Sequence, residues 1–134
     1  MMKWTVPRNI ADLLSADSDQ MWQDDQFEPL IITAMGGTLF GGRQVAVLWQ
    51  IEFDPADLEG SQGEERIADQ GHEPDGYGWT ALILADLAQR YPACVPFVKG
   101  DEEAATCVIC AEQADVFEKL VEVALVTIAG DGDD

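Results

Sequence analysis

Positive charge is scarce in this chain. Only 7 of its 134 residues are Lys or Arg, against 26 Asp and Glu, so the formal net charge at pH 7 is −19. A surface this negative repels nucleic acid and anionic lipid and attracts basic proteins. Nucleic acid and membranes are therefore excluded as expected partners, and a basic protein is favoured.

Long apolar runs are missing as well. No stretch approaches the roughly 20 apolar residues that a membrane-spanning helix requires. No apolar segment follows the basic N-terminal residues, as it would in a signal peptide. The three cysteines Cys94, Cys107 and Cys110 are an odd number in a chain long enough to fold without disulfide bonds. Reduced thiols and a cytoplasmic location fit these features best.

The sequence offers little for catalysis or for holding a cofactor. His72, the only histidine, has no convincing serine or cysteine beside it to act as a nucleophile. Cys107 and Cys110 have C-x-x-C spacing, but residues three apart in a strand point to opposite faces, so we expect core cysteines. The glycine pairs at 36–37 and 41–42 match no phosphate-binding pattern and are expected in turns. We therefore predict a non-catalytic protein with no cofactor and no metal.

Apolar residues are plentiful, at 47% of the chain, which separates it from acidic disordered tails. The length predicts a single domain over residues 1–134, with a frayed acidic tail at 130–134. The clearest element is a strand at 44–53, where large apolar residues alternate with others and so share one face. These residues are Val45, Val47, Trp49, Ile51 and Phe53.

Apolar periodicity and turn residues predict the remaining elements. They are a strand at 30–35 ending in a glycine turn, a helix at 79–91, strands at 94–98 and 105–111, and a helix at 113–128. Asp115 and Glu118 have the spacing of a capping box at the start of the last helix. The first 27 residues predict only helical turns at 10–14 and a loop at 17–26.

The order of these elements predicts the fold class. Strands come in adjacent pairs, which favours hairpins and a mainly antiparallel sheet over parallel crossovers. Two principal helices packed on one face of that sheet would complete an α+β two-layer sandwich.

Residues 54–75 are predicted to form a long acidic loop. With Glu52 the segment holds nine carboxylates against one basic residue, Arg66, and beyond Leu58 only Ile67 is strongly apolar. Loops of this length are commonly functional, so we predict a partner-binding surface here. Tyr77 and Trp79 follow as aromatic anchors, although Trp79 could instead fill the core beneath the loop. The candidate residues are Glu52, Asp54, Glu64, Glu65, Asp69, Glu73, Asp75, Tyr77 and Trp79.

The segment from Gly76 to Leu82, Gly-Tyr-Gly-Trp-Thr-Ala-Leu, resembles the Imm51 family of bacterial immunity proteins. An acidic stretch precedes this segment, a Tyr-Pro pair ends the helix, and a strand pair and an amphipathic helix follow, so the resemblance covers roughly the last 65 residues. Gly78 stands where the family often has an acidic residue. The resemblance implies a protein that neutralises a toxin encoded beside it.

Two classes of function remain open at this stage. The first is an immunity protein that blocks a cognate toxin with a basic surface, by non-catalytic binding through its acidic surface. The alternative is a small-ligand or metal-binding domain, or an enzyme, with the carboxylates gathered in an acidic pocket. An interaction module outside toxin biology and a merely solvated acidic loop are further options. The sequence does not fix the oligomeric state.

Overall fold

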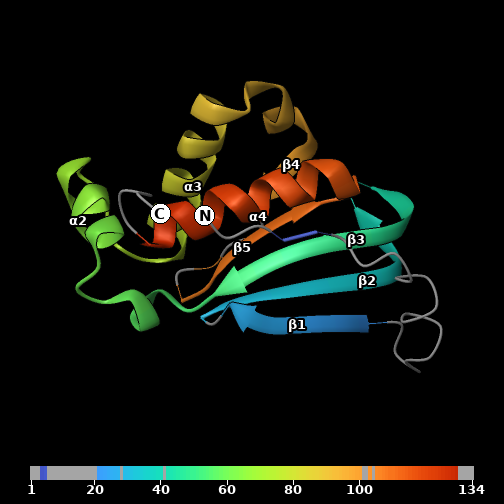
Figure 1. Cartoon of the computed structure of the whole chain (residues 1–134), viewed down its shortest axis with the longest axis horizontal. Coiled ribbons are helices and arrows are strands. Elements are labelled where there is room, and N and C mark those ends of the chain that lie inside the picture. Colours follow the sequence, from blue (N-terminus) through green and yellow to red (C-terminus); the bar gives the residue numbers. More distant parts are fainter. Residues whose placement is uncertain are drawn as a thin grey trace.

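The fold is a five-stranded antiparallel sheet with helices packed on one face (Figure 1). The computed structural model describes residues 4–5, 21–27, 29–40, 42–100, 103 and 105–129. The predicted helical turns at 10–14 and the predicted frayed tail at 130–134 lie outside these residues. The elements are β1 Met21–Phe27, β2 Leu30–Phe40, β3 Arg43–Phe53, η1 Pro55–Leu58, α2 Gln62–Asp69, α3 Gly76–Arg90, η2 Pro92–Phe97, β4 Val98–Gly100, β5 Cys107–Ala111 and α4 Ala114–Ala129.

The sheet order is β1-β2-β3-β5-β4, and every neighbouring pair is antiparallel. The two long helices α3 and α4 pack with the strands around one shared core, with α4 lying along the sheet (Figure 1). This arrangement confirms the predicted α+β class. None of the described helices has the length and apolar character needed to cross a membrane.

Where its side chains are described, the central strand β3 behaves as its alternation predicts, and the side chain of Val45 lies outside that part. Trp49, Ile51 and Phe53 are buried in the main core, while Leu48 joins a small second cluster with Cys110 of β5. Cys107 belongs to the main core instead, so the two thiols lie on opposite faces of β5 as expected. The cysteines are buried and free of disulfide bonds.

Strand β1, at one edge of the sheet, differs from the prediction. Residues 21–27 form strand β1 rather than a loop, and half-buried Trp22 and Phe27 pack against the core. The polar side chains between them hid this strand, because an edge strand buries only one face. Strand β2 also runs through Gly36, which pairs with Val47. The glycine turn at 36–37 is therefore wrong, and the reversal falls at Gly42, whose φ of 82° suits glycine.

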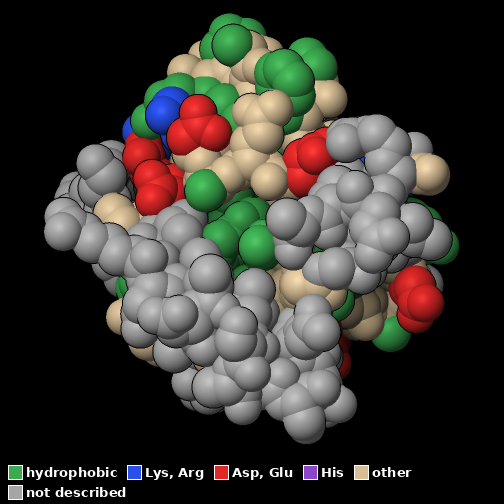
Figure 2. All heavy atoms as spheres, turned by 90° about the vertical axis from the view of Figure 1, so that its right-hand side faces the viewer, with side chains coloured by type: hydrophobic (Ala, Val, Ile, Leu, Met, Phe, Trp, Pro, Cys, Tyr) green, Lys and Arg blue, Asp and Glu red, His purple; other side chains and the backbone are tan. Residues whose placement is uncertain are grey.

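The segment predicted as a strand at 94–98 is instead the 3-10 helix η2, and only β4 after it is a strand. Pro92 and Pro96 have no N–H to donate to a sheet, which favours the short helix. Val95 and Phe97 remain 37% and 46% exposed. Figure 2 shows hydrophobic side chains gathered at the top of the molecule, where α3 leads into η2 in Figure 1.

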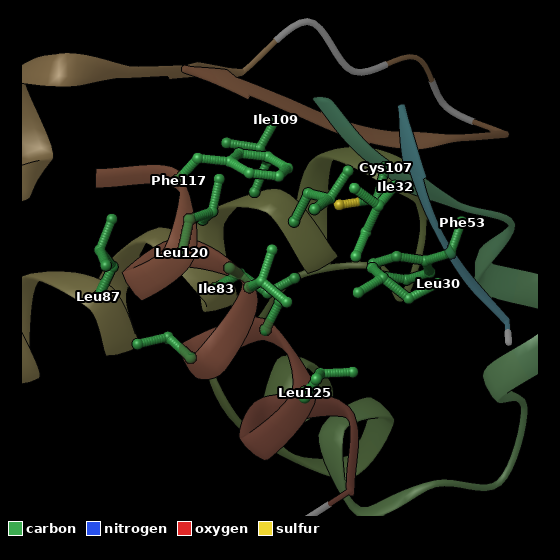
Figure 3. Close-up of a cluster of buried hydrophobic side chains, with 14 of the residues drawn as sticks. Leu30, Ile32, Phe53, Ile83, Leu87, Cys107, Ile109, Phe117, Leu120 and Leu125 are labelled. Atoms are coloured by element: carbon green, nitrogen blue, oxygen red, sulfur yellow. The ribbon is translucent and has the colours of Figure 1, made fainter. Parts of the chain in front are cut away.

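Helix α4 forms as its apolar stripe predicts, and it packs against both α3 and the strands of the sheet. Figure 3 shows Phe117 and Leu120 of α4 in the cluster of buried side chains that also holds Ile83 of α3 and Ile109 of β5. Phe117 stacks on Trp49 at 5.5 Å between ring centroids, and Trp4 meets both rings edge-on. The helix begins at Ala114, so Asp115 lies in the first turn and is not the predicted cap. A carboxylate there still complements the helix dipole.

Candidate functional site

The acidic segment at 54–75 is not a loop. It folds into η1 and α2, each started by a capping side chain. The Asp54 carboxylate accepts a hydrogen bond of 2.9 Å from the N–H of Ala56, and the Ser61 hydroxyl accepts one of 3.2 Å from the N–H of Glu64. These caps satisfy donors that the first turn of a helix leaves unpaired. The expectation of a loop over 54–75 is therefore wrong, because both short helices are capped and each buries one apolar side chain in the core.

Few apolar contacts hold η1 and α2 in place, and each helix buries one large apolar side chain. Leu58 and Ile67 are both buried in the main core. Gly63 lies directly against the ring of Trp79, so close that a Cβ at this position would overlap the ring. The contact requires glycine, because any larger residue would push α2 away from α3.

A charged contact completes the attachment of α2. Arg66 donates two hydrogen bonds to the Asp86 carboxylate of α3, at 3.0 and 2.7 Å. The Thr127 hydroxyl of α4 donates a third, at 2.7 Å. Three helices are therefore joined at one carboxylate, and the bidentate form of the Arg–Asp pair is the stronger geometry.

This contact shifts the ionisation of both partners. Burial of Asp86 acts to raise its pKa, but the hydrogen bonds from Arg66 and Thr127 and the nearby positive charges outweigh burial and hold the pKa below its ordinary value. The hydrogen bonds to Asp86 raise the pKa of Arg66. Both side chains are therefore charged at neutral pH.

The candidate residues separate by exposure. Five are exposed to solvent and available to a partner: Asp54, Glu65, Asp69, Glu73 and Tyr77, the last at 54%. Asp54 also caps η1, as described above. Arg66, the one Lys or Arg of residues 54–75, is already paired with Asp86 of α3.

Three of the other candidates are half-buried and have structural contacts. Glu52 accepts a hydrogen bond from Gln50 on the same strand, on the sheet face opposite Ile51 and Phe53. Glu64 accepts the N–H of Gly60 at 3.1 Å. Asp75 caps α3 by accepting the N–H of Gly78 at 3.0 Å. These three carboxylates are already hydrogen-bonded within the protein, so they are less available to a partner than the exposed ones.

Trp79 is fully buried and is not a contact residue. Its ring meets Phe53 edge-on at 5.5 Å between centroids, and its Nε1 has no hydrogen-bond partner among the described residues. The alternative expectation, that Trp79 fills the core beneath the acidic segment, is the one that the structure supports.

The Gly-Tyr-Gly-Trp segment has a clear structural logic. A Cβ on Gly76 would overlap the backbone oxygens of Glu103 and Thr106, and a Cβ on Gly78 would overlap that of Glu73. Both glycines thus allow the start of α3 to press against neighbouring backbone, while Tyr77 between them stays exposed. An acidic side chain has no room at position 78.

A groove of about 410 Å³ lies between α2, α3 and α4, and sequence reasoning missed it. Asp86 is the only carboxylate among its described lining residues, and it is engaged by Arg66. None of the candidate carboxylates is among the residues that line this groove. Among the described residues, no three or more His, Cys, Asp or Glu side chains form a group that could hold a metal ion. No local signal could have found the groove, because Arg66 and Asp86 are 20 residues apart.

Comparisons with protein-family models, curated proteins and solved structures find no match for this chain.

Proposed function

We propose that this protein is an inhibitor that binds a basic protein partner through the exposed face of α2 and the adjoining residue Tyr77. The partner proposed is a cognate bacterial toxin, neutralised in the cytoplasm by occupation of its functional surface. Binding alone accounts for the inhibition, and no catalytic residue is assigned.

One observation carries the proposal: α2 is an ordered helix with exposed carboxylates, and its one arginine is paired with a residue of another helix. The helix is anchored through Ile67 and the Gly63–Trp79 contact. Its arginine is held by Asp86 of α3. Glu65 and Asp69 remain exposed on the outer side. Carboxylates on an ordered helix lose little conformational entropy when a partner binds.

Tyr77 gives the surface an aromatic centre. It is one of the few large hydrophobic residues exposed among the described positions, and the packing of Gly76 and Gly78 fixes its backbone. Exposed tyrosines surrounded by polar groups are frequent hot spots of protein interfaces. Tyr77 therefore supplies contact area where the carboxylates supply attraction.

The electrostatics suit a toxin that acts on nucleic acid. Such a toxin needs a basic groove for its substrate, and an acidic inhibitor can occupy that groove. Complementary charge accelerates association towards 10⁸–10⁹ M⁻¹s⁻¹ at low salt, as a general limit. The resemblance of residues 76–82 to the immunity family supports the same reading.

Capture of the partner from the native bacterium tests the proposal first. Tagged protein should retain a single basic toxin domain at low salt and release it at high salt, because the attraction is screened. A toxin gene adjacent to the gene of this protein would support the assignment. Recovery of a specific partner that is neither basic nor a toxin would overturn it.

Association kinetics with that partner then locate the surface. Combined Glu65→Gln, Asp69→Asn and Glu73→Gln should lower the association rate at low salt about tenfold. Asp69→Asn should slow association more than its matched control, Asp115→Asn, which removes the same exposed group from α4. Equal effects of the two single variants would show that net charge, and not this surface, governs binding.

Tyr77→Ala should act on dissociation instead. Loss of a hot-spot aromatic typically costs about 2 kcal/mol or more, which appears mainly as a faster off-rate. An unchanged off-rate would remove Tyr77 from the interface while leaving the carboxylate surface in place.

A further inference from the structure

Helix α3 carries no charge on the face that it turns away from the core. Its inner face is buried in the main core, whereas α4 exposes Asp115 and Lys119 to solvent. The spacing i, i+4, i+7, i+8 and i+11 places five uncharged residues on the opposite, outer face of α3. They are Tyr77, Ala81, Leu84, Ala85 and Ala88, all exposed except the half-buried Leu84. A helix that is apolar on both faces is normally covered on both.

Carboxylates are nearly absent from this part of the chain. Between Asp75 and Asp101 the sequence has one acidic residue, Asp86, and that residue is paired with Arg66. Acidic residues make up 26 of the 134 positions of the whole chain. Two copies of a protein with a net charge of −19 repel one another, so they can approach closely only where carboxylates are sparse.

The large hydrophobic side chains that are exposed in the described part of the chain all belong to α3 and to η2, which follows it. They are Tyr77 at 54%, Val95 at 37% and Phe97 at 46%. Pro92 and Ala93 of η2 are exposed as well. Figure 2 shows hydrophobic side chains gathered at this end of the molecule. Exposed apolar patches of this kind mark surfaces for protein contact.

The outer face of α3 is nearly symmetric about its midpoint at 84–85. Ala81 and Ala88 are equally far from this midpoint, and so are Tyr77 and Pro92. When two identical helices pack antiparallel around a twofold axis, such equidistant positions face one another. The alanines then allow the two helix axes to approach closely, and Tyr77 of each copy lies beside Pro92 of the other.

From the uncharged outer face, the exposed hydrophobic side chains and the symmetry, we infer that a second copy of this protein binds here, with the two α3 helices antiparallel and Ala85 near the twofold axis. This inference does not rest on the proposed function. Where both hold, Tyr77 belongs to both surfaces, so the protein binds its toxin as a monomer.

Sedimentation equilibrium of the full chain tests the inference at protein concentrations from about 5 to 500 µM. A reversible dimer with a Kd on the order of 10–100 µM is expected, because one helix face is small for a protein interface. Raising the NaCl concentration from about 50 to 500 mM should tighten the dimer, because salt screens the repulsion between two acidic chains. The toxin complex is expected to weaken with salt, so the two associations are distinguishable.

Two variants with the same substitution locate the interface. Ala85→Glu brings two carboxylates, one from each copy, to the twofold axis and should weaken the dimer about tenfold or more. Ala56→Glu adds the same charge at an exposed position of η1 and should change the Kd less than twofold. Tyr77 is unchanged in both variants. Circular dichroism of both should match that of the parent protein.

Disulfide cross-linking tests the antiparallel arrangement. Ala85→Cys should form linked dimers on mild oxidation, because its Cβ lies close to the same atom of the second copy. Ala56→Cys is the control and should stay unlinked. The three natural cysteines are buried and should contribute little.

Three outcomes would overturn the inference. A chain that stays monomeric up to about 500 µM, well above the expected Kd, would leave the outer face of α3 to a different protein. A dimer that is no weaker in Ala85→Glu than in Ala56→Glu would use another surface. Linked dimers of Ala56→Cys as abundant as those of Ala85→Cys would reflect random collision.

Discussion

Helices α4 and α2 are attached to this protein in opposite ways. The 16-residue α4 contributes a continuous apolar stripe to the core, whereas the eight-residue α2 contributes one buried isoleucine and a glycine pressed on Trp79. An arginine joins α2 to the other helices. A helix that is held by a few contacts leaves most of its surface exposed. In α2 that exposed surface carries Glu65 and Asp69.

The largest effect is expected on the α4 side of this comparison. Phe117 is fully buried and contacts the rings of both Trp49 and Trp4. Phe117→Ala should lower the free energy of unfolding by about 3–5 kcal/mol, because it removes buried area and leaves a cavity. Urea denaturation followed by circular dichroism measures the change. A loss below about 1 kcal/mol would show that α4 is not anchored through this cluster.

A smaller effect is expected where α2 meets Trp79. Gly63→Ala should lower stability by about 1–3 kcal/mol, because its Cβ overlaps the Trp79 ring. The same substitution should be less harmful in a Trp79→Phe background, because a phenyl ring does not reach as far as the outer ring of the indole that the Cβ would overlap. Alanine then gains its advantage in helix propensity over glycine. Equal costs in the two backgrounds would show that the Gly63–Trp79 contact is not what limits this position.

The ion pair that joins α2 to α3 should make stability depend on pH. Because the folded-state pKa of Asp86 is lowered, its contribution is fully present above about pH 5 and is lost as the pH falls through that pKa. Asp86→Asn should therefore cost about 1–2 kcal/mol at pH 7, and the cost should shrink as the pH is lowered below the ordinary pKa of an aspartate. Urea unfolding at neutral and at acidic pH measures this difference. Glu65→Gln is the control, and an Asp86→Asn cost that is constant with pH would contradict the sign.

The smallest effect on stability is expected on the outer face of α2. Glu65→Gln combined with Asp69→Asn should change the free energy of unfolding by less than about 0.5 kcal/mol, since both side chains are exposed. The same pair of changes should slow association with a basic partner. Thermal unfolding measured beside the association rate separates the two roles. A destabilisation above 1 kcal/mol would mean that these carboxylates support the fold instead.

The elements that were predicted correctly are those whose signal lies within their own sequence. The alternation of β3 and the stripes of α3 and α4 reflect burial against one face, so periodicity reveals them. Strand β1 and helix α2 were missed because their order depends on partners elsewhere in the chain. Strand β1 pairs along β2, and α2 rests on Trp79 of α3.

The same distinction applies to the candidate site. The sequence predicts Tyr77 as an aromatic anchor, and this residue is exposed, while for Trp79 it allows either a contact or a core position. The attachment of Arg66 to Asp86 and Thr127 was not foreseeable, because residues 20 and 41 positions away from Asp86 supply these contacts. The sequence alone therefore could not show that Arg66 pairs with Asp86 and so does not neutralise the carboxylates of residues 54–75.

Strand β1, at the edge of the sheet, also bears on how copies of this protein behave towards one another. Edge strands can add a strand from another chain and so begin aggregation, and charged residues on the edge oppose this. Asp24 and Asp25 lie within β1, in a chain whose isoelectric point is about 4.1. The acidity that we propose for attracting a partner thus also opposes edge-to-edge pairing of identical chains at neutral pH, and this opposition weakens as the pH falls towards the isoelectric point.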